Sequence, residues 1–358
     1  METLIQQAVQ LYENASAAHE RSDFTRSEAL HLECIDLFQQ AEGPLSLNAA
    51  SVYTALAELR QQVGDLDGAL QAATQADSIL MSLGIDNSGD DVSGVRIQTW
   101  VQIGAIHRHR AEYDQAETWL QRALDLAIHQ FGEDSEAASD ARNELGILYK
   151  YTAEYEKAGA LYQTALNQLL DRFGEQNSSV AAIYHNLGGL EHARQRFTDG
   201  EPYARKAWEI NRQMLGEDHP TTLADAAAYA GLLDGLERYS ESEPIYRRVL
   251  AGFTTLYGQE HYEIAVNLNN LANVRNACGD PQEAESLFRR AIAIKEKILG
   301  PDHPDTALSL NNLGVILVEQ GRTTEARRLF RRALRIFRKH LGDYHPKTEM
   351  ARANLTAP

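Results

Sequence analysis

The chain has 358 residues, of which 43% are hydrophobic and only 9 are proline, so it can bury a substantial core and is not a disordered polymer. Its formal net charge of −17 argues against a general nucleic-acid-binding protein, because phosphate contacts require a basic surface. The opening METLIQQAVQ lacks the regions of a secretory leader, and no apolar run approaches the length of a membrane span. We therefore expect a cytoplasmic protein without nucleic-acid or membrane partners.

A period of 42 residues runs along the chain. Six related segments mark it in order: FGEDSEAAS at 131, FGEQNSSVA at 173, LGEDHPTTL at 215, YGQEHYEIA at 257, LGPDHPDTA at 299 and LGDYHPKTE at 341. Upstream, Phe24 and Leu66 are also 42 residues apart, and GIDNSGDDVSG at 84–94 is expected to be a longer loop between repeats. A fixed period of this length is typical of repeat architectures, so we predict eight units and a final partial one.

Each unit is predicted to contain two amphipathic helices. In the eighth unit, Leu310, Leu313 and Leu317 recur at helical spacing, and Phe330 and Phe337 mark the buried face of the second helix. A column of small residues has the same 42-residue phase: Gly104, Gly146, Gly188, Ala230, Ala272 and Gly314. Small residues there allow the two helices to approach closely.

The pattern L-x-x-L-G/A, followed by Y/F-x-x-A and a further alanine, resembles the tetratricopeptide repeat. The 42-residue length, with LNNL and LGxDHPxT, is similar to the kinesin light chain-like subclass. The resemblance implies an all-α right-handed superhelix of about eight helix-turn-helix repeats with a C-terminal capping helix. It predicts one domain, 1–358, with repeats at 1–42, 43–90, 91–132, 133–174, 175–216, 217–258, 259–300 and 301–342 and a partial repeat or cap at 343–358.

The resemblance also implies a concave groove lined by fixed first-helix positions, which we expect to bind an extended peptide. These are the positions three and six before the small column and one and four after it. The predicted groove residues are Gln98, Val101, Arg108, Asp140, Asn143, Lys150, His185, His192, Val266, Asn269, Asn273, Asn276, Leu308, Asn311 and Val315.

The stretch NLNNLANVRN at 267–276 contains five asparagines, although asparagine is unfavourable within a helix. Asn269, Asn273 and Asn276 share the groove register, and their amides can pair with a peptide backbone. Alternatively, these amides bond neighbouring helices or water, which is the interpretation that fits Asn267 and Asn270. One hydrogen bond contributes about 0.5–1.5 kcal/mol, so several units must act together.

Arg108, Lys150, His185 and His192 fall in the groove register of three successive units and favour an acidic ligand. The alternative is a mixed polar wall, because Asp140 has the same register. The repeated histidines, such as His219 and His303, are expected to pack in loops rather than to bind a metal, because equivalent positions in stacked repeats lie about 8–10 Å apart.

No catalytic motif such as GxSxG or HExxH is present, and Cys34 and Cys278 form neither a disulfide framework nor a metal pattern. We therefore expect no enzyme and no cofactor. Cys34 lies in a small-residue column, which predicts that it is buried.

The two ends of the chain differ in charge. Residues 1–94 contain 15 acidic and 3 basic side chains, whereas residues 301–358 contain 6 acidic and 10 basic ones, largely on one helix. The pattern predicts that this helix is a solvated cap. Alternatively, it is a surface for head-to-tail self-association or for an anionic partner. We predict a scaffold that binds a protein or peptide; the alternative is a regulatory protein whose superhelix pitch changes when a peptide binds.

Overall fold

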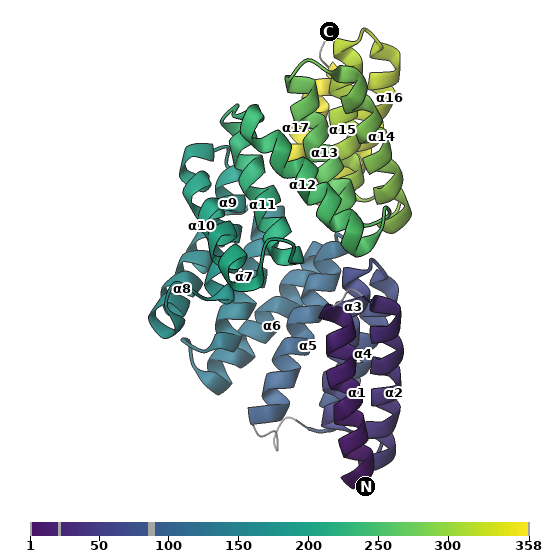
Figure 1. The fold of residues 1–358 in the computed structure, drawn as a ribbon, viewed down its shortest axis with the longest axis vertical. Helices are drawn as coiled ribbons and strands as arrows, with labels where there is room; N and C mark the ends of the chain where they lie inside the picture. Colours follow the sequence, from purple (N-terminus) through teal and green to yellow (C-terminus); the bar gives the residue numbers. More distant parts are fainter. Residues whose placement is uncertain (1, 21–22, 85–89, 357–358) are drawn as a thin grey trace. The chain divides into compact units, whose positions relative to one another are not determined.

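The structure, a computed structural model, describes residues 2–20, 23–84 and 90–356. All regular secondary structure in these ranges is helical, and Figure 1 shows consecutive helices packed in pairs. None of the described helices combines the length and the apolar character that crossing a bilayer requires. The predicted all-α class with helix-turn-helix repeats is confirmed.

The chain forms two compact units, Met1–Leu148 and Tyr149–Pro358, with the boundary inside one helix. The assignment of 1–358 to one domain stays a prediction. The first unit contains α1 (Glu2–Glu20), α2 (Phe24–Glu42), α3 (Leu47–Gln62), α4 (Leu66–Ser82), α5 (Asp90–His109), α6 (Tyr113–Phe131) and most of α7 (Glu136–Tyr151).

The second unit begins with the last turn of α7 and continues the helix pairs to a final single helix. It contains α8 (Tyr155–Phe173), α9 (Ser178–Ala193), α10 (Phe197–Leu215), α11 (Pro220–Gly235), α12 (Tyr239–Tyr257), α13 (Tyr262–Ala277), α14 (Pro281–Ile298), α15 (Pro304–Glu319), α16 (Thr323–Leu341) and α17 (Pro346–Thr356). Odd-numbered helices are the first helices of the repeats, and even-numbered helices are the second helices.

The loop predicted at 84–94 is shorter than expected at its C-terminal end. Helix α5 already begins at Asp90, so residues 90–94 are helical, and residues 85–89 lie outside the described ranges. Asp91 suits the first turn of this helix because a carboxylate interacts favourably with the positive end of the helix dipole.

Glycine ends the second helices where the backbone must turn sharply. Gly216 and Gly342 have φ of +91° and +82°, which glycine adopts without the steric cost that a Cβ adds. The turns within the six pairs from α5 and α6 to α15 and α16 also use a positive φ, at Ala111, Ala153, Gln195, Glu237, Gly279 and Gly321. These residues are 42 apart, so the turn geometry repeats with the helices.

The small-residue column lies where the two helices of a pair meet. A Cβ added to Gly314 would lie 2.5 Å from Phe330 Cε1, and one added to Gly104 would lie 2.5 Å from Leu120 Cγ. Phe330 itself is buried in a core that includes Phe288 and Phe337. Cys34 is fully buried, as predicted, and its thiol donates to the carbonyl of Ala8.

The close approach at Gly314 predicts opposite effects for the same substitution at two helical glycines. G314A should lower the free energy of unfolding by about 1–2 kcal/mol, because overpacking against the buried Phe330 ring outweighs the gain in helix propensity. G159A should raise it by about 0.5–1 kcal/mol, because a Cβ there meets its nearest neighbour, Leu190, at 3.5 Å. Urea unfolding monitored by circular dichroism measures both changes, and equal effects at the two sites would contradict this packing.

Candidate peptide-binding groove

The repeated histidines cap the N-termini of the first helices. The Nδ1 atoms of His219, His261 and His303 accept hydrogen bonds from the backbone amides of Thr221, Glu263 and Asp305, at 3.1–3.3 Å. Asn177 performs the same role one repeat earlier, and N-capping by a side-chain acceptor satisfies an amide that the helix leaves unpaired. The described residues contain no cluster of three or more His, Cys, Asp or Glu side chains suited to a metal.

His345 caps the last helix and also makes a distant contact within the second unit. Its Nδ1 accepts from the Lys347 amide, and its Nε2 lies 3.1 Å from the carbonyl oxygen of Tyr151 at the end of α7. The two contacts together require the neutral ring with the proton on Nε2. Burial, followed by the Lys347 charge, lowers the pKa of His345 and favours this neutral form.

Two of the predicted groove amides bond neighbouring helices instead of facing solvent. Asn269 is 6% exposed, and its Oδ1 accepts from the Ser309 hydroxyl of α15 at 2.9 Å. Asn311 is 2% exposed and accepts from the Asn354 amide of α17 at 3.0 Å. For Asn269 and Asn311 the structure therefore supports the alternative that these amides bond neighbouring helices. A buried amide cannot pair with a peptide.

The other groove positions of α13 and α15 differ in accessibility. Asn273 is exposed, and its side-chain amide makes no hydrogen bond within the described ranges. Asn276 donates to Glu319 of α15 at 3.0 Å in a partly exposed contact. Val266 and Leu308 are half-buried, whereas Val315 is 37% exposed.

The two asparagines predicted to lie off the groove register behave differently from Asn273. Asn267 is buried and donates to the Glu263 carbonyl one turn earlier, and its Oδ1 lacks a hydrogen-bond partner among the described residues. Asn270 is half-buried.

The predicted cationic cluster is partly neutralised in the second unit. His185 lies 2.7 Å from the buried carboxylate of Asp225 on α11. Gly189 leaves room for Lys150, because a Cβ at that position would lie 3.2 Å from the Lys150 Nζ. Partial desolvation, followed by the Lys150 charge, lowers the pKa of His192, so this side chain adds little positive charge at neutral pH.

In the first unit, the predicted groove positions have a more acidic character. Arg108 pairs with Glu144 at 3.1 Å, and both side chains are mostly buried. Desolvation and the nearby Glu136 and Glu144 carboxylates raise the pKa of Asp140 to about 6. Gln98 is exposed, whereas Val101 and Asn143 are half-buried. The structure therefore supports a mixed polar wall here better than a positive one.

A polar network connects the groove register to the second helices, and the pattern within a single repeat does not indicate it. His185, Asp225 and Asn211 form one chain of contacts, because the Asn211 amide donates to Asp225 at 2.7 Å. Two repeats later, Asn269, Ser309 and Lys295 form the equivalent chain, in which the Lys295 ammonium donates to the Ser309 hydroxyl at 3.0 Å.

The sequence signal for this network is a polar residue in an otherwise apolar core column. Second-helix positions Leu169, Asn211, Phe253, Lys295 and Phe337 follow one another at 42 residues, and all five are buried. Burial lowers the pKa of Lys295, whereas Asp305 opposes that shift. Burial likewise disfavours the Asp305 carboxylate, but His303, Lys295, Lys347 and the Tyr262 hydroxyl outweigh it and hold its pKa at about 2.

Replacing the buried ammonium tests whether this network stabilises the fold. K295F should lower the free energy of unfolding by about 2 kcal/mol, because Ser309 loses a partner inside the core and Asp305 loses a cation. K295F/S309A reproduces the Phe337 and Ala351 pair found one repeat later, so it should recover about half of that loss. Denaturant unfolding of the two single variants and the double variant measures the coupling, and additive effects would contradict the network.

A comparison with family models finds the tetratricopeptide repeat at residues 95–171, 179–255 and 263–339. A comparison with curated proteins finds no match. Among solved structures, the Rap conjugation gene regulator of the plasmid pLS20 in complex with the Phr* peptide is 13% identical, with a TM-score of 0.67. The similarity covers 94% of this chain and 95% of that chain.

Two further structures show the range of similar proteins. A Rap protein complexed with Competence and Sporulation Factor is 14% identical, with a TM-score of 0.61 and coverage of 83% of this chain and 78% of that one. A putative kinesin light chain with nearly identical repeats from Podosopora anserina is 22% identical, with a TM-score of 0.43 and coverage of 56% and 94%. At 13% and 14% identity, the two Rap structures show the fold alone. Because the family model matches more than half of the residues, the chain belongs to the tetratricopeptide repeat family.

Proposed function

We propose that the second unit is a non-enzymatic scaffold that binds an extended peptide, or a segment of a partner protein, along its first helices. The exposed groove-register residues His192, Asn273 and Val315 carry the proposal, because they lie on α9, α13 and α15 and keep polar and apolar surface accessible. Lys150 and Asn276 add a cation and a partly exposed amide in the same register. Asn269 and Asn311 are left out because both are buried.

The energetic argument favours several repeats acting together. Micromolar binding requires about 8 kcal/mol, whereas one hydrogen bond contributes only about 0.5–1.5 kcal/mol. Apolar contacts at Val315 and Val318, which are 37% and 39% exposed, add a burial contribution of about 25 cal/mol per Å² of apolar surface. The two similar Rap structures contain a bound peptide or factor, which supports the proposal by analogy of fold.

Blocking the groove with two arginines tests the proposal. A random peptide library selects a ligand for the intact chain, and fluorescence anisotropy then measures its Kd. N273R/V315R should weaken binding by at least about tenfold, because the long charged side chains occupy the exposed groove positions.

The matched control places two arginines at exposed positions of second helices. Q213R/A293R makes the same change on α10 and α14 and should bind within about threefold of the unmodified chain. Circular dichroism confirms that both variants remain helical. Equal affinities for N273R/V315R and the unmodified chain would exclude the groove as the binding site.

A ligand-gated switch is a second candidate function, and the contact between His345 and Tyr151 favours it. This contact joins the residue that precedes α17 to the last residue of α7, and the Lys347 ammonium in the first turn of α17 lies 5.7 Å from the Tyr151 ring. Small rotations between successive repeats accumulate along a stack of this kind, and the contact between His345 and Tyr151 joins the first and last segments of the second unit. A peptide in the groove would therefore change the distance between these two helices.

Spin labels at E154C and Y344C measure that distance. Both positions are exposed, and C278S removes the exposed cysteine, whereas Cys34 is buried and burial raises its pKa to about 11. Pulsed electron paramagnetic resonance should show a shifted distance distribution when the selected peptide is added. An unchanged distribution at saturating peptide would reject the switch and leave a passive scaffold.

A further inference from the structure

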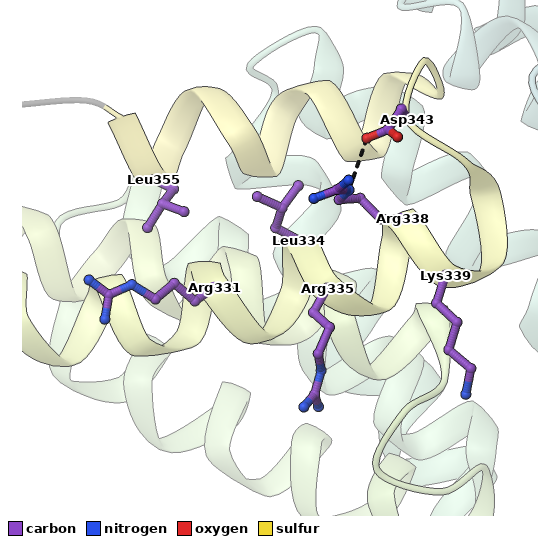
Figure 2. A pocket seen from close by; sticks show the side chains of 7 residues that line it. All are labelled: Arg331, Leu334, Arg335, Arg338, Lys339, Asp343 and Leu355. Atoms are coloured by element: carbon purple, nitrogen blue, oxygen red, sulfur yellow. Dashed lines mark ion pairs between the residues drawn. The ribbon is translucent and has the colours of Figure 1, made fainter.

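The surface between α16 and α17 is hollowed and strongly basic. A cavity of about 440 Å³ lies at this surface. Figure 2 shows the side chains that line it, among them Leu334 and Leu355. Both leucines are half-buried and pack against the core beneath them. Four cations also line the cavity: Arg331, Arg335, Arg338 and Lys339.

Only part of this positive charge is neutralised. Arg338 pairs with Asp343 at 2.9 Å, as Figure 2 shows, and Arg335 pairs with Asp302 at 3.0 Å. Neither Arg331 nor Lys339 has an ion-pair partner in the part of the chain that the structure describes. An occupant of this cavity therefore meets two unpaired cations beside an apolar floor.

The equivalent arginines of earlier repeats indicate which kind of group Arg331 would bind. Arg289, one repeat earlier, pairs with Glu285 on its own helix at 2.7 Å and with Glu325 in the first turn of the next second helix at 2.9 Å. Arg247 makes the equivalent contacts two repeats earlier, with Glu243 at 2.8 Å and Glu283 at 3.4 Å.

At Arg331 the residue one turn earlier is Arg327 rather than a glutamate, and within the described ranges no second helix follows α17. In this register, the equivalent arginines pair with a carboxylate in the first turn of an adjacent helix. Such a helix would pack beside α16 and α17, as α16 packs beside α15.

A second copy of the chain fits this position less well. In α2, the residue equivalent to Glu283 and Glu325 is Arg26, which would repel Arg331. Helix α2 is also packed along its length against α1. Although residues 1–94 are acidic overall, α2 has no carboxylate at the position equivalent to Glu283 and Glu325.

We propose that the cavity between α16 and α17 binds an amphipathic acidic helix of a partner protein. A carboxylate in the first turn of that helix pairs with Arg331, further acidic residues face Lys339, and an apolar face covers Leu334 and Leu355. This helix-in-groove mode uses apolar anchors for affinity and charge for orientation. The site is separate from the first-helix groove and does not depend on the peptide proposed there.

A peptide derived from this chain is a suitable probe. Residues 280–299 contain α14 with Glu283 in its first turn, and R289E and R290E in the peptide supply the acidic face. Fluorescence anisotropy of the labelled peptide with the full chain should show saturable binding. R331E in the chain should weaken binding by at least about tenfold, and a peptide that also carries E283K should recover affinity for the R331E chain.

R328E is the matched control, because Arg328 is an exposed arginine on the same helix that does not line the cavity. This variant should bind the original peptide within about threefold of the unmodified chain. Equal weakening by R328E and R331E would show attraction to overall charge and would overturn the proposal. A dimer in sedimentation velocity that R331E dissociates would also overturn it in favour of self-association.

Discussion

The close contact between the two helices of each repeat is the constraint on which this structure depends. At Gly314 there is no space for one additional carbon atom beside the Phe330 ring, and Gly104 has the same relation to Leu120. The column recurs every 42 residues as glycine or, at Ala230 and Ala272, as alanine, so a small residue sets the phase of these first helices relative to their partners. One face of each first helix is buried against its partner helix, and the opposite face stays accessible. The core packing therefore decides which first-helix residues line the groove.

In the second unit, polar contacts in the core also constrain how neighbouring helices are oriented. The chains His185–Asp225–Asn211 and Asn269–Ser309–Lys295 occupy equivalent positions two repeats apart. Between them, Phe253 occupies the corresponding core position with apolar surface. The Asn211 Oδ1 has no hydrogen-bond partner among the described residues. The contacts that are made still fix the orientation of neighbouring helices, since a shifted register would leave further buried groups unpaired. The asparagine-rich stretch is therefore partly a structural feature of the repeat interface.

Much of the fold could be predicted from the sequence because periodicity reports directly on packing. The helix pairs, the small-residue column and the burial of Cys34 all follow from the 42-residue phase. The accessibility of individual amides could not be predicted in the same way. Asn269 and Asn273 share a predicted face, but only Asn269 has Ser309 within reach on the next first helix, and that contact depends on the rotation between repeats.

The polar residues in the core were missed for a related reason. A single lysine in an amphipathic helix is normally expected to be exposed to solvent. The equivalent residues in other repeats, Phe253 and Phe337, are buried and show that the position of Lys295 is internal. Similarly, the basic character assigned to Arg108 ignored Glu144, which follows 36 residues later and neutralises it. Charge at a groove position depends on partners in the next repeat, and a sequence pattern within one repeat does not contain that information.

The central claim is that the first helices of the second unit hold the ligand. Photo-crosslinking tests it most directly: the library-selected peptide carries a benzophenone side chain, and mass spectrometry identifies the attached residues after irradiation. We expect attachment to α9, α11, α13 and α15, near His192, Asn273 and Val315. Attachment confined to the second helices α10, α12 and α14 would contradict it.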